Sequence, residues 1–505
     1  MEATNVKQCW ECRRRRLVCD VTHPECRKCK VRGVACPGYG QKPVRWLKPQ
    51  QVNSKGPERM IVFRTFKDQS GRQMSAVLEA IEYYNLHIAT DLVATGTRGA
   101  HNPYWMPRSA ARFLPPSCAQ SIVCTSLCHR ILQLSDAPES DQIILARRLQ
   151  RHRGEALRAL NADLAKQDLQ ASDVTLASVL LLLLVEIQQS FEPPSWRNHG
   201  KGAAAIINLK GGFGNMVISH PYLCHLFRYY ALIEVMGNTT SHRIETESAR
   251  SQLELISLIP ILYGNGLATC FPCPPDLLAE IIRINHLRSV FASATALTPS
   301  SDSMGTILQE ENKQTAALDV FWRIASFSTS KWAAEVAVST SGDENPMSIA
   351  GWSDIASIYQ SAIAVYCLAS LLHDTMTSSK SDTTKTVSEP YPYSNSNAGP
   401  NPDLKLIVAE ARKMYASTLI SKLKEASKDA RLRKLVLWPL FVAGVEAGNE
   451  DARRFVAGEL RWISNALGTA TPLVARDLLE KRIWALGLGK GSWDTIFDQS
   501  YVFVV

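Results

Sequence analysis

The chain has 505 residues, of which 46% are hydrophobic and 20% are charged, and its net charge is +9. This composition excludes an intrinsically disordered chain and is sufficient for more than one domain with a buried core. The longest apolar run, near residues 176–185, is about half the length needed to cross a bilayer, so we predict no contact with a membrane.

The excess positive charge lies at one end of the chain. Residues 1–60 contain 14 Lys or Arg and 5 Asp or Glu, and this excess equals the net charge of the whole chain. A basic head on an electrically neutral body is typical of a protein that binds a polyanion. The first ten residues contain no apolar signal-peptide core, so we expect a reducing compartment, where clustered cysteines favour metal binding over disulfides.

Six of the 13 cysteines form two copies of the pattern C-x2-C-x6-C. They are Cys9, Cys12, Cys19, Cys26, Cys29 and Cys36. A structural zinc ion takes four tetrahedral ligands, so six thiolates hold two Zn²⁺ only if two of them bridge both ions. A segment this short cannot bury a core, and we expect the metals to supply its folding free energy. The alternatives are a single zinc held by Cys9, Cys12, Cys26 and Cys29, and a disulfide framework.

This stretch resembles the DNA-binding domain of the fungal binuclear zinc-cluster transcription factors. The matching features are the basic run at residues 13–16, Asp20 after the third cysteine, and Pro24 two positions before the fourth. The resemblance implies that each C-x2-C pair begins a short helix and that a loop containing Pro24, often cis in this family, joins the halves. It also implies that Cys9 and Cys26 bridge the two Zn²⁺ ions.

The resemblance further implies that the first helix enters the major groove of double-stranded DNA and reads CGG triplets. Arg15 and Arg16 match the base-facing positions of the family, and Arg13 matches a position that contacts the DNA backbone. Guanine offers its O6 and N7 acceptors to such side chains. Val18 stands where the family commonly has a basic residue, which puts one phosphate contact in question, and Arg14 offers a substitute charge.

We expect residues 1–40 to form the zinc-cluster domain and residues 41–60 to form a polar, basic linker that contains Pro and Gly. Many zinc-cluster regulators dimerise through a coiled coil at this point. Residues 40–100 contain no run of three a/d heptads, so binding as a monomer and dimerisation as a homodimer through the large domain both stay open.

For residues 61–505 we predict an all-helical domain, because apolar residues recur at helical spacing and period-two alternation is nearly absent. The predicted helical stretches are 75–92, 155–169, 176–187, 252–262, 276–290, 352–372, 404–426 and 435–447. The run 176–187 would also suit a buried parallel strand, but its length and leucine content favour a helix. Residues 375–402 are rich in Ser, Thr, Pro and Asn and are predicted to be a disordered loop, and residues 293–305 a shorter break.

This domain resembles the fungal-specific transcription-factor regulatory domain. The resemblance rests on residues 176–186 leading into residues 196–203, on residues 438–447, and on Trp484 and Trp493. Together the two resemblances imply a nuclear, zinc-dependent and sequence-specific transcription factor of RNA polymerase II genes. They also imply co-regulators or the transcription machinery as partners, and they suit a metabolic or biosynthetic gene set as the target.

No catalytic pattern is found, because GxGxxG and GxSxG do not occur and Lys210-Gly211-Gly212 lacks the frame of a P-loop. We therefore predict that the protein is not an enzyme. Two alternative classes stay open: an enzyme with an accessory DNA-binding head, and an architectural DNA binder without an activation function.

The remaining cysteines and aromatic residues have a functional and a structural interpretation. Cys124-x3-Cys128-His129 and Cys270-x2-Cys273 lack a second ligand pair at a fitting distance, so we interpret them as buried or incidental groups. Trp196, His199 and Trp438 are candidate linings of a small-molecule pocket that would regulate the protein through its large domain, although packing in the core is the more frequent role of such residues.

Overall fold

The structure, a computed structural model, describes residues 8–36 apart from 10, 13, 14, 16 and 35. It then describes residues 71–94, 102–133, 139–189, 196–241, 246–297, 303–342, 346–373 and 402–504. The chain divides into two compact units, Met1–Met60 and Ile61–Val505. The predicted linker at 41–60 lies outside the described residues, as does the predicted loop at 375–402 apart from its last residue.

The first unit contains one short helix, α2 (Arg27–Val31), which follows Cys26. Glu11 and Cys12 form a helical turn in the equivalent place of the first half, and the backbone N–H of Arg15 donates to the Glu11 carbonyl at 3.1 Å. The structure thus begins a helical turn after each C-x2-C pair, as the resemblance implies.

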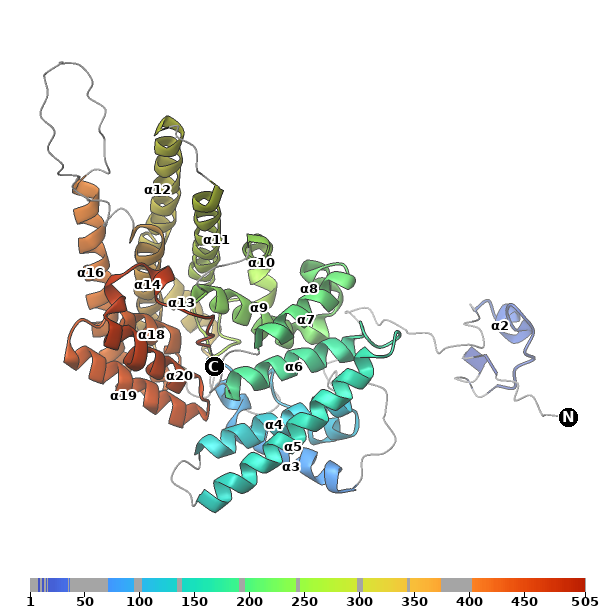
Figure 1. The fold of residues 1–505 in the computed structure, drawn as a ribbon. Coiled ribbons are helices and arrows are strands. Elements are labelled where there is room, and N and C mark those ends of the chain that lie inside the picture. The colour runs from blue at the N-terminus through green and yellow to red at the C-terminus, as the bar shows by residue number, and fades with distance from the viewer. Residues whose placement is uncertain are drawn as a thin grey trace, which may run out of the picture. The chain divides into compact units, whose positions relative to one another are not determined.

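The second unit is helical throughout its described residues, where no strand occurs. Its first part contains α3 (Gly71–His87), α4 (Pro116–Gln133), α5 (Glu139–Leu164), α6 (Asp173–Gln189) and α7 (Trp196–Leu209). Helix α4 packs against α3, α5 and α6, and α5 runs alongside it (Figure 1). The run 176–187, for which a strand was the alternative, is therefore part of a helix.

The middle part contains α8 (Phe213–Ser219), α9 (Cys224–Thr239), α10 (Thr246–Leu262), α11 (Pro275–Leu297), α12 (Ser303–Ala325), α13 (Thr329–Ser339) and α14 (Ile349–Leu371). The break predicted at residues 293–305 is wrong over most of its length. Helix α11 continues to Leu297 and α12 begins at Ser303, because serine, threonine and alanine tolerate a helix when its neighbours are packed.

The last part contains α16 (Pro402–Ala426), α17 (Ala430–Arg433), α18 (Leu437–Val445), α19 (Glu450–Leu467) and α20 (Thr471–Leu478), which continues into a π-helical turn at Leu479–Trp484. Short 3-10 turns lie at Ala89–Asp91, Arg108–Arg112, Pro221–Leu223, Leu488–Lys490 and Trp493–Thr495. Every stretch predicted from apolar spacing overlaps one of these helices, and the all-helical fold is confirmed.

Helix α14 forms the centre of the core. Its aromatic residues Trp352, Tyr359 and Tyr366 are fully buried, and α11, α12, α13, α16 and α18 pack against it. Among the described residues it is the one helix long and apolar enough to cross a membrane, with a mean hydropathy of 1.3, but 72% of that window is buried inside the protein. A helix that is apolar on all sides and covered by other helices has the character of a core helix.

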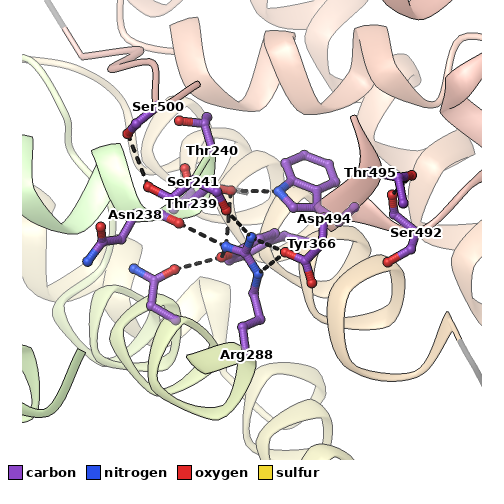
Figure 2. Close-up of polar contacts among 12 residues, drawn as sticks. Asn238, Thr239, Thr240, Ser241, Arg288, Tyr366, Ser492, Asp494, Thr495 and Ser500 are labelled. Atoms are coloured by element: carbon purple, nitrogen blue, oxygen red, sulfur yellow. Dashed lines mark hydrogen bonds and ion pairs between the residues drawn. The ribbon is translucent and has the colours of Figure 1, made fainter. Parts of the chain in front are cut away.

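A buried arginine ties α9, α11, α14 and the end of the chain together (Figure 2). Arg288 on α11 donates to the carbonyls of Asn238 at 2.8 Å and Ser241 at 2.7 Å, and to the Tyr366 hydroxyl at 2.8 Å. Its Nε also donates to Asp494 at 3.0 Å. The last carbonyls of a helix have no partner within the helix and carry a partial negative charge, so a guanidinium at the end of α9 satisfies both needs.

Residues 493–504 form a C-terminal segment that docks on the same end of α9. The Thr240 hydroxyl donates to the Tyr501 carbonyl at 2.6 Å and accepts from the Tyr501 N–H at 2.7 Å. Trp493 donates to the Thr239 carbonyl at 2.6 Å, and Phe503 is buried in the main core. The segment therefore completes the core that α9, α14 and α18 begin.

Candidate metal centre and nucleic-acid interface

The six N-terminal cysteines bring their sulfurs into two groups of four. The groups are Cys9, Cys12, Cys19 and Cys26, and Cys9, Cys26, Cys29 and Cys36, and within each group all sulfurs lie within 4.8 Å of one another. The Cys9 and Cys26 sulfurs are 3.6 Å apart and belong to both groups. This is the arrangement that two metal ions with two bridging ligands require.

The two halves repeat the same local geometry. The Cys12 N–H donates to the Cys9 sulfur at 3.4 Å, and the Cys29 N–H donates to the Cys26 sulfur at the same distance. In each half the first cysteine of C-x2-C thus sits at a helix N-terminus and accepts from the backbone three residues later. The repeat in sequence is therefore a repeat in structure, and it aims both shared sulfurs inward.

The chemistry of these donors fits zinc. Five of the six cysteines are buried, and Cys36 is partly exposed. Burial raises the pKa of the Cys9 thiol far above its ordinary value and that of Cys29 to about 12. Six crowded sulfurs would therefore stay protonated unless cations lay between them, and Zn²⁺ is the soft, tetrahedral cation that thiolates prefer. The cluster supplies ligands for two Zn²⁺ ions.

Asp20 joins the two halves of the cluster. Its carboxylate accepts from the Thr22 hydroxyl at 2.8 Å and from the Arg27 N–H at 3.0 Å, where α2 begins. These hydrogen bonds, that of Thr22 first, hold the pKa of Asp20 below its usual range. The loop between the halves contains the cis peptide bond His23–Pro24. The acidic residue after the third cysteine thus caps the second helix, a role that the sequence alone did not indicate.

Of the three predicted DNA contacts, only Arg15 belongs to the described residues; Arg13 and Arg16 lie outside them. Arg15 is exposed and pairs with Glu11 one helical turn earlier. Val18 is 74% exposed and adds no charge at its position. On the second half, Arg27, Lys28 and Lys30 also present exposed basic side chains, which the sequence analysis did not assign to DNA.

In the large unit, a cavity of about 610 Å³ lies between the ends of α6 and α20, the π-helical turn, the start of α7 and the C-terminal segment. Trp196 lines it, whereas His199 and Trp438 do not. Trp438 is buried in the core, where its indole N–H donates to the Thr239 hydroxyl at 3.3 Å. The three residues predicted as pocket linings therefore do not share one site, and Trp438 has the structural role.

The other cysteine patterns do not form metal sites among the described residues, where the N-terminal cluster supplies the two groups with metal-ligand geometry. Cys124, Cys128 and His129 are buried in α4, and His129 bonds to the Tyr83 hydroxyl at 2.9 Å through its Nδ1. Cys270 and Cys273 are also buried. These residues are packing groups, as expected.

Comparisons with known proteins match the two units separately. Residues 7–45 match the family described as fungal Zn(2)-Cys(6) binuclear cluster domain, and residues 81–503 match the fungal specific transcription factor domain. A phomenoic acid biosynthesis cluster-specific transcriptional regulator of Leptosphaeria maculans is 28% identical over 519 residues, which cover 99% of this chain and 89% of that protein. Arginine metabolism regulation protein II of Saccharomyces cerevisiae is 44% identical over 48 residues, 10% of this chain and 5% of that protein. No solved structure matches the chain significantly.

Proposed function

The chain belongs to the fungal regulators that combine a binuclear zinc cluster with a fungal-specific transcription factor domain, and from this premise we propose that it controls RNA polymerase II transcription of a biosynthetic gene set in the nucleus. It is a zinc-dependent DNA-binding transcription factor. The observation that carries the proposal is the pair of four-sulfur groups that share Cys9 and Cys26. The full-length relative, named as the regulator of one biosynthesis cluster, supports a gene cluster as the target.

In this proposal residues 1–40 are the head, residues 41–60 the linker and residues 61–505 the regulatory domain. Cys9, Cys12, Cys19, Cys26, Cys29 and Cys36 hold the two zinc ions. The first helical turn lies in the major groove, Arg15 and Arg16 read a CGG triplet, and Arg13 contacts phosphate. Guanine recognition by arginine supports the CGG assignment, and the exposure of Arg15 is compatible with it.

The test is a genome-wide map of bound sites combined with selection of bound sequences from a random duplex pool, using the full chain. We expect recovered sites to contain CGG and to cluster upstream of neighbouring biosynthetic genes. A Cys9→Ala chain is the control, and it should recover no sequence above background. A preference without CGG would contradict the base assignment, and scattered sites without any motif would favour the architectural binder.

We further propose that the helical unit regulates transcription and has no catalytic activity. It comprises most of the chain and is electrically neutral, so attraction of DNA as a whole cannot be its main contribution. The cavity that Trp196 lines supports a small-molecule signal, and co-regulators are the expected protein partners. Whether the chain acts as a monomer or a homodimer is settled by light scattering of the zinc-loaded protein with and without duplex DNA.

Fusion of residues 61–505 to an unrelated DNA-binding domain tests the regulatory role. We expect reporter output that changes with growth conditions. Output equal to that of the DNA-binding domain alone, with the fusion protein present at normal abundance, would contradict regulation and leave an architectural DNA binder.

A further inference from the structure

Helix α5 exposes a face on which every charged side chain at its centre is an arginine. Arg147, Arg151 and Arg158 are exposed to solvent. Successive helical residues are rotated by about 100° and rise by about 1.5 Å, so these three positions lie within roughly 40° of one another and span about 16 Å. Gly154 lies between them on the same face, and the Arg158 guanidinium lies over it, 3.5 Å from the place of a Cβ.

These three arginines have no carboxylate partner within 4.0 Å among the residues that the structure describes, and the polar contact of Arg151 is with His152. Other arginines nearby are paired: Arg153 of the same helix binds Glu186 at 2.5 Å, and Arg130 of α4 binds Glu79 at 2.6 Å. The unit is thus neutral overall but carries an uncompensated positive stripe along α5. Such a stripe attracts a polyanion.

The local environment reflects this positive potential. His152 is buried beneath the stripe, and burial first, with the charges of Arg151 and Arg148 added to it, lowers the pKa of its imidazole. Glu155 lies 3.8 Å from His152 rather than on the arginines. The face therefore remains cationic at neutral pH, because the nearest carboxylate is directed toward the histidine.

We propose that the α5 face binds phosphates of the duplex that the zinc cluster holds, at base pairs flanking the cluster's own site. Resting on the proposed DNA-binding function, this inference assigns the large unit a share in DNA affinity. Three features favour DNA as the occupant. Arginine forks suit phosphate oxygens. A stripe of about 16 Å passes several phosphates, because each strand carries one per roughly 3.4 Å of helix axis. The zinc cluster also keeps the duplex at high local concentration.

The connection between the units permits this. From Cys36 to Gly71 there are 35 residue steps, which span at most about 120 Å when fully extended. A contact of α5 with flanking DNA is sequence-independent, so it adds affinity and salt dependence without changing the preferred motif.

The experiment compares full-length, zinc-loaded chains on a 16-base-pair and a 60-base-pair duplex, each with one central CGG. The variant is R147Q/R151Q/R158Q. The matched control is K413Q/R454Q/R461Q, which removes three exposed positive charges from α16 and α19. Affinity is measured between 50 and 200 mM salt. Each lost phosphate contact lowers the slope of log affinity against log salt by about 0.9, so the variant should lose about 40-fold less affinity over this range than the wild type on the long duplex.

We expect this loss of slope on the 60-base-pair duplex, with little change on the 16-base-pair duplex and none in the control chain. The inference is overturned if the variant and the control behave alike on the long duplex, which is also the result expected if the stripe binds an acidic polypeptide instead. Equal slopes of the wild type on both duplexes, or an equal reduction on both, would overturn the flanking placement. Circular dichroism and the melting temperature verify that the variants fold. Failure of the proposed function looks different, because the wild type would then bind neither duplex and the inference would fall with it.

Discussion

The Arg15 side chain lies against Glu11, with 2.5 Å between Arg15 Nε and Glu11 Oε1, one helical turn apart. The arginine side chain is 33% exposed and the glutamate 17%, so the pair sits at the edge of the zinc cluster. Residues four apart on a helical turn face the same side, and the carboxylate therefore fixes the direction in which the guanidinium points. A base-reading arginine held in place in this way loses less conformational entropy when it meets guanine.

Replacement of Arg15 or Arg16 by alanine should lower discrimination between CGG and scrambled duplexes by about 1–3 kcal/mol, because a bidentate guanine contact is lost. Glu11→Gln should lose part of this discrimination, because Arg15 is no longer oriented. Arg13→Ala is the control, and it should weaken binding to both duplexes alike and flatten the salt dependence. Unchanged discrimination in Arg16→Ala by fluorescence anisotropy would show that this residue does not read bases.

The full chain should bind two zinc ions, measured by native mass spectrometry and elemental analysis. Cys9→Ala should release both, because its sulfur belongs to both four-sulfur groups and the metals supply the folding free energy of the unit. Cys118→Ala, which removes a buried thiol of the large unit, is the matched control and should retain two. One zinc per wild-type chain would refute the binuclear assignment.

The large unit should lose stability as the pH falls from about 6.5 toward 4. Burial, with a contribution from His87, lowers the pKa of His129 to about 4, and burial beside Arg228 does the same to His225. The unfolded chain takes up these protons near the ordinary pKa of 6.5, so protonation favours unfolding in this window, by on the order of 3 kcal/mol for His129.

Urea unfolding of the large unit at several pH values measures this effect. His129→Gln should show a shallower dependence of the unfolding free energy on pH than the wild type. The matched control is His23→Gln, which changes an exposed histidine of the other unit. Parallel pH profiles for the wild type and His129→Gln would contradict the assignment.

Arg288→Met should destabilise the large unit by about 3–5 kcal/mol, because it leaves Asp494 and the last carbonyls of α9 without their buried partner. Arg288→Lys should not restore the loss, since one ammonium cannot replace the guanidinium fork. The control is Arg283→Met on the same helix, with an expected cost below about 1 kcal/mol, because Glu280 keeps its partner Arg323. Denaturant midpoints decide, and a loss in Arg288→Met no larger than in the control would refute the clamp.

The sequence predicts the helices whose apolar residues recur on one face, and it misses those whose polar residues are buried. Helix α4 was not predicted. Its Ser117 and Gln120 are buried, and they bond to Ser178 at 2.6 Å and His152 at 2.5 Å, partners 61 and 32 residues away. A buried serine or glutamine in sequence looks like a solvent-facing one until its partner is known. Periodicity alone therefore cannot identify such a helix.

The six cysteines of the candidate metal site could be predicted because the spacing of metal ligands is local and repeats within 28 positions. The Arg288 clamp could not, since Arg288 and Asp494 are 206 residues apart and neither stands in a recognisable pattern. The same holds for the α5 stripe, because the spacing of Arg147, Arg151 and Arg158 predicts a shared face but not the absence of carboxylate partners. Long-range packing decides which charges are compensated.

The docking of the C-terminal segment on α9 also determines the order in which the protein matures on the ribosome. The hydrogen bonds between Thr240 and Tyr501 join residues 261 positions apart. At a synthesis rate of roughly 5–20 residues per second, the end of α9 waits about 13–50 s for its partner. The zinc-binding cysteines emerge long before this, so each nascent chain carries a complete DNA-binding head before its regulatory core can close. Translation that stops before residue 493 would release heads whose control domain never finishes folding.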